Sequence, residues 1–253
     1  MADSSTPHTE LQQLTQQALV YLLVAALALW LASLWLSEEF ATGRDFSIKA
    51  MLLFICAAAW LGLYLPEHLP HGRLGPANLV TLGRLALTAL VGGMVGETSA
   101  ALAWPAVIIA STVLLLDGVD GWLARRGGCS SAFGARFDIE TDALLVLLLA
   151  LLCLQLGKAG AWVLLSGAMR YLFVAAGMVW QWLRRPLPER RRRKAVCVLQ
   201  VLSLLIALVP AVPLPWSSGI AAAGLVLLCY SFLVDVAWLR RRSDRIYAGV
   251  DSR

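Results

Sequence analysis

The chain is 253 residues long, and 59% of its residues are hydrophobic whereas only 15% are charged. This composition excludes an ordinary soluble domain and is typical of a protein that crosses a membrane several times. The formal net charge is +5, but no aromatic-interleaved basic face accompanies the cations, so we expect no nucleic-acid partner. We therefore predict an all-α fold, a polytopic bundle of membrane helices.

The predicted elements begin with a cytoplasmic tail over residues 1–16 and two extra N-terminal transmembrane helices over residues 17–65. A linker rich in Pro and Gly follows over residues 66–75. The core is expected over residues 76–242, and a second cytoplasmic tail over residues 243–253. A helix needs about 20 apolar residues to cross a bilayer. The runs that meet this length lie near 17–36, 49–65, 84–103, 105–126, 133–156, 160–183, 195–213 and 218–239.

The core opens on residues 77–84, which mix apolar and polar positions. We expect a short helix lying in the membrane interface before the third span begins. Arg84 at its end is counted with the basic loops, and every second loop of the chain is basic. Lys and Arg concentrate on the cytoplasmic side. We therefore expect an integral protein of a bacterial inner (plasma) membrane, with both termini in the cytoplasm and basic loops that contact anionic membrane lipids.

Four aspartates lie within the apolar part of the core at helical spacing. Asp117 and Asp120 are three residues apart, and Asp138 and Asp142 are four apart. Residues at these separations share one face of a helix. Only a short segment, 126–133, separates the helices that carry the two pairs, so we expect two antiparallel neighbouring helices whose acidic faces converge on the cytoplasmic side.

Carboxylates at membrane depth are costly unless a cation compensates them. An ion-pair network with Arg125, Arg136 and Arg170 would account for one or two of the acids but not for four on adjacent helices. Carboxylate oxygens without Cys or His ligands suit Mg²⁺ or Mn²⁺. Gly121, Ala124 and Gly134 remove bulk beside the acids, either to admit a flat phosphorylated ligand or to let helices pack closely.

The complete pattern runs D-x2-D-G-x2-A-R-x8-G-x3-D-x3-D from Asp117 to Asp142. It resembles the sequence motif of the CDP-alcohol phosphotransferase family, and every defining position is present. The upstream stretch from Pro76 to Arg84 resembles the segment that precedes the first helix of that family. The resemblance covers roughly residues 76–242, and residues 1–65 lie outside it.

The resemblance implies a six-helix membrane enzyme of phospholipid synthesis that moves a phosphatidyl or phospho-alcohol group from a CDP-linked donor to an acceptor hydroxyl and releases CMP. It implies a pair of divalent metal ions, Mg²⁺ or Mn²⁺, with Asp142 also as the catalytic base, and it leaves a homodimer open. The implied metal ligands are Asp117, Asp120, Asp138 and Asp142. The implied lining of the pocket for the CDP moiety is Gly121, Ala124, Arg125 and Gly134.

The donor and acceptor are less defined than the reaction type. The hydrophobic surroundings favour CDP-diacylglycerol as the donor lipid. Arg170, inside the sixth apolar run, is predicted either to pair with an aspartate or to bind the phosphate of an acceptor, and it favours glycerol 3-phosphate. Inositol phosphate, serine, choline, a second lipid, or a CDP-alcohol donor with diacylglycerol are alternatives. A cation transporter and a catalytically silent relative are the alternatives of other classes.

Overall fold

The computed structural model describes residues 7–65, 74–127, 132–184 and 191–250. Residues 66–73 of the predicted linker and parts of the basic loops lie outside these ranges. The chain divides into two compact units, residues 1–148 and 149–253. Every regular element described is helical, which confirms the predicted all-α class. The elements are α1 (Pro7–Phe40), α2 (Phe46–Gly62), α3 (Pro76–Gly93), η2 (Ala100–Leu102), α4 (Ala103–Gly127), α5 (Ala132–Gln155), η3 (Ala161–Val163), α6 (Leu164–Val179), η4 (Gln181–Arg184), α7 (Arg191–Leu208) and α8 (Trp216–Val250).

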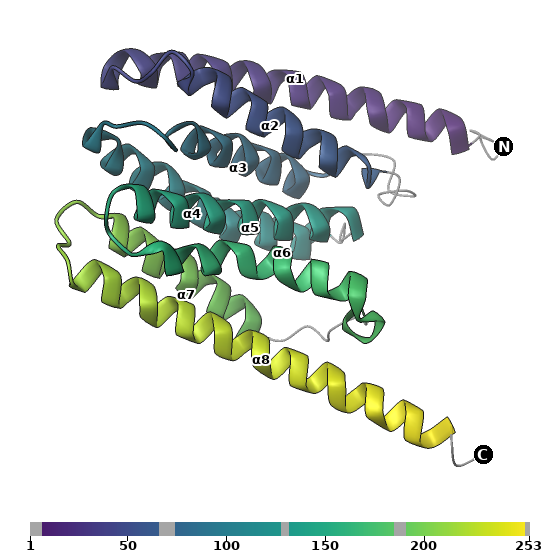
Figure 1. The fold of residues 1–253 in the computed structure, drawn as a ribbon. Helices are drawn as coiled ribbons and strands as arrows, with labels where there is room; N and C mark the ends of the chain where they lie inside the picture. The colour runs from purple at the N-terminus through teal and green to yellow at the C-terminus, as the bar shows by residue number, and fades with distance from the viewer. Residues whose placement is uncertain (1–6, 66–73, 128–131, 185–190, 251–253) are drawn as a thin grey trace. The chain divides into compact units, whose positions relative to one another are not determined.

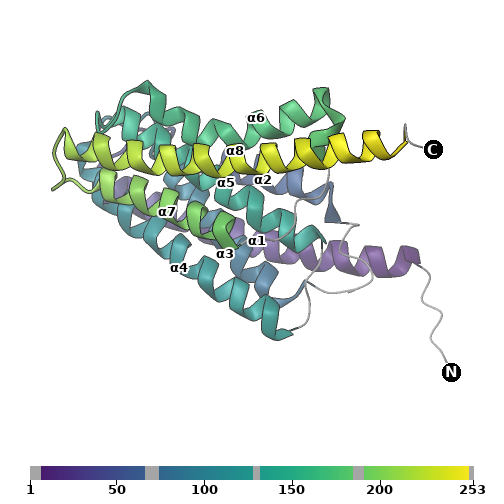
Figure 2. The same cartoon turned by 90° about the horizontal axis from the view of Figure 1, so that it is seen from below.

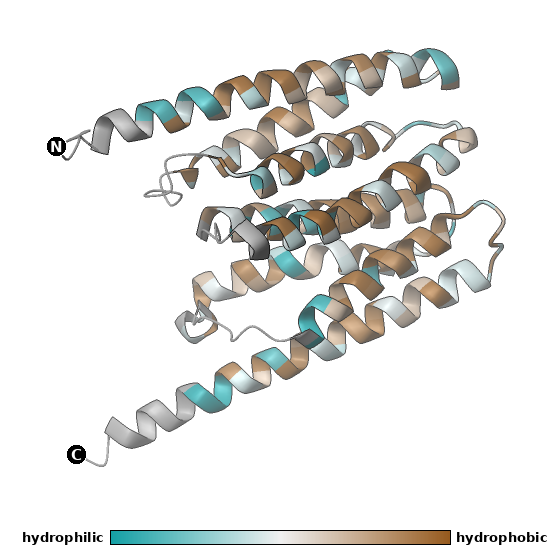
Figure 3. Ribbon diagram, turned by 180° about the vertical axis from the view of Figure 1, so that it is seen from behind, coloured by the Kyte–Doolittle hydropathy of each residue, from teal (hydrophilic) through white to brown (hydrophobic). Residues whose placement is uncertain are grey.

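Hydropathy supports a membrane protein in both units. Among the described residues, four helices are long and apolar enough to cross a membrane, and the shorter α2 is also apolar. These four segments are Gln12–Phe40, Ala100–Leu123, Ala161–Val179 and Trp216–Arg242. Figure 3 shows that the middle of α1 and the first half of α8 are hydrophobic, while polar residues lie toward the ends of the chain. Large apolar side chains such as Leu23 (69% exposed) and Leu115 (73% exposed) point outward, as expected for contact with lipid tails.

The first unit contains α1 to α4 and most of α5, connected so that consecutive helices run in opposite directions (Figures 1 and 2). The expected short interfacial helix is wrong, because residues 76–93 form one continuous helix, α3. Pro76 occupies the first turn, where its fixed φ favours helix formation and its missing N–H costs nothing. Arg84 is therefore an internal helix residue and does not lie in a loop.

Helices α2 and α3 approach each other closely at two glycines near the end of α3. A Cβ on Gly92 would lie 2.3 Å from Leu53 Cδ2, and a Cβ on Gly93 would lie 3.0 Å from the Phe46 carbonyl oxygen. Small residues permit this kind of approach between membrane helices. The first two helices thus pack against the core rather than forming a detached pair.

A polar cluster joins the same elements beyond the end of α3. Glu97 is 8% exposed; its Oε1 lies 2.7 Å from Lys49 Nζ, and its Oε2 accepts a hydrogen bond from the Gly43 amide at 2.7 Å. Lys49 also donates to the Val95 carbonyl at 3.0 Å and lies 3.2 Å from Asp45. We call Gly43, Asp45, Lys49, Val95 and Glu97 the Lys49 cluster. It ties the α1–α2 and α3–α4 connections together.

The second unit is held by comparable contacts between α7 and α8. Arg192 lies 2.5 Å from Asp235 and donates to the carbonyl and hydroxyl oxygens of Ser231, both at 3.1 Å. Lys158, after α5, donates to three carbonyls that follow the end of α7, those of residues 209, 210 and 212. Polar groups within this unit are therefore used to fix helix ends.

Candidate active site

Helix α4 carries Asp117 and Asp120 on the same face as its small buried residues. Ala106, Ala110 and Val113 are at most 1% exposed, and steps of four and three residues lead from Val113 to the two aspartates. Positions three and four apart share a helix face, and α4 packs against α3. The packing of the small residues therefore turns both carboxylates toward the interior of the unit.

Helix α5 supplies the second pair from the edge of its buried face. Phe133, Phe137 and Thr141 recur every four residues and are at most 6% exposed, and the Thr141 hydroxyl donates to the Phe137 carbonyl at 2.9 Å. Asp138 and Asp142 each follow one of these residues by a single position. Their side chains are therefore partly accessible, at 38% and 30%, and can meet a ligand from outside the bundle.

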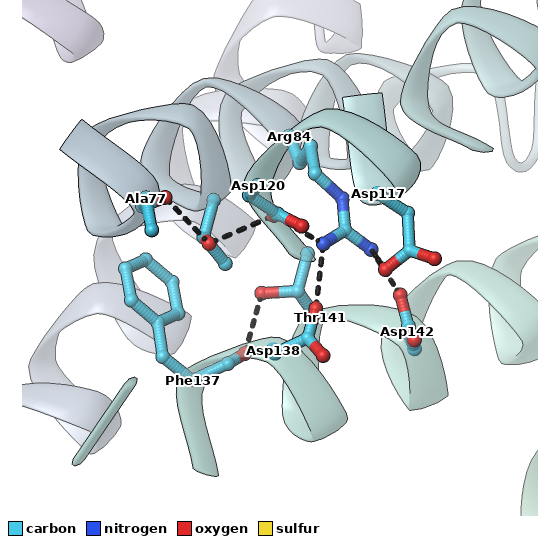
Figure 4. Close-up of polar contacts among 9 residues, drawn as sticks. Ala77, Arg84, Asp117, Asp120, Phe137, Asp138, Thr141 and Asp142 are labelled. Carbon is cyan, nitrogen blue, oxygen red and sulfur yellow. Dashed lines mark hydrogen bonds and ion pairs between the residues drawn. The ribbon is translucent and has the colours of Figure 1, made fainter. Parts of the chain in front are cut away.

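The guanidinium of Arg84 lies among all four carboxylates (Figure 4). Its Nη1 is 2.6 Å from Asp120 Oδ2 and 2.6 Å from Asp138 Oδ1. Its Nη2 is 3.0 Å from Asp117 Oδ1 and also forms an ion pair with Asp142 Oδ1. Arg84 is fully buried. One side chain from α3 thus connects the acidic faces of α4 and α5.

Thr81, one turn before Arg84, adds a second link between α3 and α4. Its hydroxyl lies 3.0 Å from both the Asp120 Oδ2 and the Ala77 carbonyl oxygen. Asp120 Oδ2 therefore receives contacts from both Thr81 and Arg84, and its side chain is only 5% exposed. Asp120 is the most firmly held of the four acids.

The donor set fits a divalent metal ion. One oxygen from each of Asp117, Asp120 and Asp138 lies within 4.8 Å of the others. Mg²⁺ and Ca²⁺ bind oxygens at roughly 2.0–2.6 Å, so two ligand oxygens on opposite sides of such an ion lie about 4–5 Å apart. The three carboxylate oxygens are no farther apart than this. Four carboxylates face one guanidinium, which leaves a formal excess of three negative charges. A hard divalent cation matches both the oxygen chemistry and the charge.

The structure describes the side chains of only some of the residues predicted to bind the nucleotide or the acceptor. Gly121 follows Asp120 on α4 and is partly exposed, and Gly134 lies one turn before Asp138 on α5 and is also partly exposed. The side chains of Ala124 and Arg125 lie outside the described residues. Arg170 lies on α6 in the second unit, half buried. The roles of these residues in binding the nucleotide or acceptor stay predictions.

Arg84 is the residue that the sequence reasoning missed. The sequence offers Arg125, Arg136 and Arg170 as counter-charges that would reach only one or two acids, whereas Arg84 reaches all four. A signal was present: Asn78, Thr81, Arg84 and Thr88 follow each other at steps of three, three and four. All four are at most 8% exposed. A polar stripe of this kind within an apolar helix indicates a buried polar site rather than a basic loop.

The fold and the site together define a class of protein. It is a helical membrane protein whose interior holds converging carboxylates that suit a divalent ion. Comparison with known proteins narrows this class. The sequence profile of the CDP-alcohol phosphatidyltransferase family matches residues 75–234, and the chain belongs to this family. It is therefore a phosphotransferase of phospholipid synthesis that uses a CDP-alcohol donor and a hydroxyl acceptor. No solved structure matches the chain.

Proposed function

We propose that this protein transfers the phosphatidyl group of CDP-diacylglycerol to a small acceptor alcohol and releases CMP on the cytoplasmic side of the membrane. The observation that carries this proposal is the convergence of four motif carboxylates from two helices on one point inside an apolar bundle. A lipid donor suits such a site because its diacylglycerol part can stay in the bilayer while its diphosphate reaches the acids.

The acids are assigned roles by their places in the family motif. One oxygen from each of Asp117, Asp120 and Asp138 lies within 4.8 Å of the others, and we assign these acids, with Asp142, to a pair of Mg²⁺ or Mn²⁺ ions. Such ions, when bound, neutralise the diphosphate and stabilise the departing CMP. Gly121, Ala124, Arg125 and Gly134 are assigned to the CDP moiety, in line with their place in the family motif.

Asp142 is the proposed general base. Its carboxylate is partly exposed, so an acceptor hydroxyl can approach it. In the transfer step the hydroxyl proton passes to Asp142, the acceptor oxygen forms a bond to the phosphorus that carries diacylglycerol, and the bond from that phosphorus to CMP breaks. Phosphoryl transfer depends mostly on positioning and charge neutralisation, and Asp142 contributes by orienting the nucleophile.

Glycerol 3-phosphate is the proposed acceptor. Arg170 and the basic loops supply cations that suit a phosphorylated alcohol, because a guanidinium binds phosphate with two parallel hydrogen bonds. If Arg170 performs this task, Arg170→Ala should raise the KM for glycerol 3-phosphate while kcat changes less. An unchanged KM would remove Arg170 from acceptor binding.

The proposal is tested by CMP release from the full chain in liposomes. CDP-diacylglycerol is supplied with Mn²⁺ and, in turn, glycerol 3-phosphate, inositol phosphate, serine and choline, and the lipid product is identified by mass spectrometry. We expect turnover that requires Mn²⁺ and is lost in Asp142→Asn. Glu140→Gln is the matched control, because Glu140 lies two residues earlier on α5 and points to a different face; its rate should stay close to that of the unchanged protein.

Other outcomes would redirect the proposal. Consumption of a soluble CDP-alcohol with diacylglycerol, and not of CDP-diacylglycerol, would reverse the donor and acceptor. Consumption of uncharged alcohols alone would exclude glycerol 3-phosphate. Movement of Mn²⁺ across the liposome membrane without CMP release would replace the enzyme by a transporter.

A further inference from the structure

We propose that Arg84 is a positioning residue, a permanent counter-cation that holds the four aspartates together before metal binds and remains among them afterwards. This inference rests on the proposed metal-dependent function but concerns a residue outside the acidic motif. It starts from the contacts of Arg84 with carboxylates on both α4 and α5, 33 to 58 residues away in sequence.

The pattern of these contacts leaves room for metal. Arg84 engages one named oxygen of each acid: Oδ1 of Asp117, Asp138 and Asp142, and Oδ2 of Asp120. Every carboxylate has a second oxygen, and each can accept more than one interaction. A divalent ion can therefore bind the acids without the guanidinium first having to leave.

Burial explains why an arginine is needed at this position. Four carboxylates close together in an apolar bundle repel one another strongly, and water cannot screen them fully. The guanidinium is planar, always charged and able to donate in several directions at once. Arg84 is fully buried, so it cannot turn away to solvent. It keeps the four carboxylates close together, so a metal ion does not have to bring them together when it binds.

The same charge also opposes metal binding. A fixed cation among the ligands repels a divalent ion, so Arg84 lowers metal affinity while it raises the stability of the metal-free protein. With two divalent ions bound, the four acids alone would be neutral, and Arg84 gives the loaded site one positive charge. That charge attracts the diphosphate of the donor. Arg84 thus lets the protein fold without metal. It also strengthens binding of the donor diphosphate while it weakens binding of the metal ions.

The test measures metal binding and stability directly rather than turnover alone. Full-length protein and Arg84→Gln are purified in detergent with Mn²⁺ present, so that the variant is never left without a cation. Thermal unfolding is then recorded with Mn²⁺ and with EDTA, and Mn²⁺ binding is followed by electron paramagnetic resonance. We expect the unchanged protein to keep most of its Tm in EDTA. The variant should lose Tm strongly in EDTA, recover it with Mn²⁺, and bind Mn²⁺ about tenfold more tightly because a nearby positive charge is gone.

Two further variants keep the test decisive. Arg84→Lys retains the charge without the planar fork, so its response to EDTA should lie between the other two. Arg192→Gln removes another arginine that pairs with an aspartate, and it should lose Tm equally with and without Mn²⁺. The proposal is overturned if Arg84→Gln and Arg192→Gln respond alike to EDTA, or if Arg84→Gln folds but no longer binds Mn²⁺. If these Mn²⁺ effects occur while no CMP is ever released, Arg84 keeps its role and the transferase proposal fails.

Discussion

The two polar clusters along α3 are built differently although both join helices in the same unit. Around Arg84, four carboxylates share one cation, and three of the acids are more than a quarter exposed. In the Lys49 cluster, the buried Glu97 has a cation on one oxygen and a backbone N–H on the other. The Arg84 site carries excess negative charge and has partly exposed carboxylates. In the Lys49 cluster, both oxygens of the buried acid have a partner. The comparison teaches that charge imbalance, more than burial, separates the proposed metal site from the cluster that only joins helices.

The largest effect is expected from removing an acid at the Arg84 site. Asp138→Asn should lower the rate of CMP release by about 100-fold or more, because a proposed metal ligand is lost and even the outer-shell partners of metal ligands contribute about 10- to 100-fold. The Tm in EDTA should be unchanged or higher, because the variant has less uncompensated negative charge. A parallel fall of Tm and activity would mean that this cluster is structural too.

The opposite result is expected in the Lys49 cluster. Glu97→Gln removes the negative charge beside Lys49 and should lower the free energy of unfolding by about 1–3 kcal/mol. Its kcat and its Mn²⁺ affinity should stay close to normal, since α3 runs about 14 Å from Arg84 to its end at Gly93 and Glu97 follows that end. Denaturant or thermal unfolding checks the first part, and CMP release the second. A large loss of Mn²⁺ affinity with unchanged stability would contradict the comparison.

A smaller effect tests how closely α2 packs on α3. Gly93→Ala places a Cβ 3.0 Å from a backbone oxygen of α2, which should cost about 1–2 kcal/mol of stability through overpacking. Gly83→Ala is the matched control on the same helix, because a Cβ there meets no atom within 4 Å. It should be neutral or stabilising, since Ala favours helix more than Gly. Equal unfolding temperatures for the two variants would show that α2 does not pack closely on α3.

The smallest effect concerns Asp45, at the exposed edge of the Lys49 cluster. Its hydrogen bond with Lys49 lowers the pKa of the Asp45 carboxyl below its ordinary value. A depressed folded pKa stabilises the protein above the pKa of the unfolded chain, near 4, and this contribution is lost as the pH falls through the folded value. Asp45→Asn should therefore lower Tm slightly at pH 7 and not at all near pH 3. A difference that grows as the pH falls would contradict this assignment.

The first two helices, α1 and α2, lie outside the residues that match the family but pack against those residues. They precede the matched residues 75–234, yet Phe46, Leu53 and Lys49 contact α3 and its following loop. At the other end of α2, the Arg136 guanidinium lies 3.9 Å from the ring centre of Tyr64, a cation–π contact with the start of α5. The pair therefore supports two helices that carry the acidic site and Arg84.

Local patterns in the sequence determined the class of the protein and which aspartates share a helix face. Apolar runs long enough to span a bilayer require helices, because backbone groups in lipid must be satisfied within the segment. Helical periodicity likewise pairs Asp117 with Asp120 and Asp138 with Asp142, since residues three and four apart share a face whatever surrounds them. The family motif rests on the same short-range spacing.

Only the tertiary structure decided which cation meets those acids. Arg84 looked like part of a basic loop because the start of its helix was expected at the wrong place, and its partners lie 33 to 58 residues away. Contacts across such separations depend on how α3, α4 and α5 pack, and that packing is set by glycines and small side chains spread over several helices. Periodicity fixes the face that each helix presents, whereas the partner of that face follows from how the helices pack together.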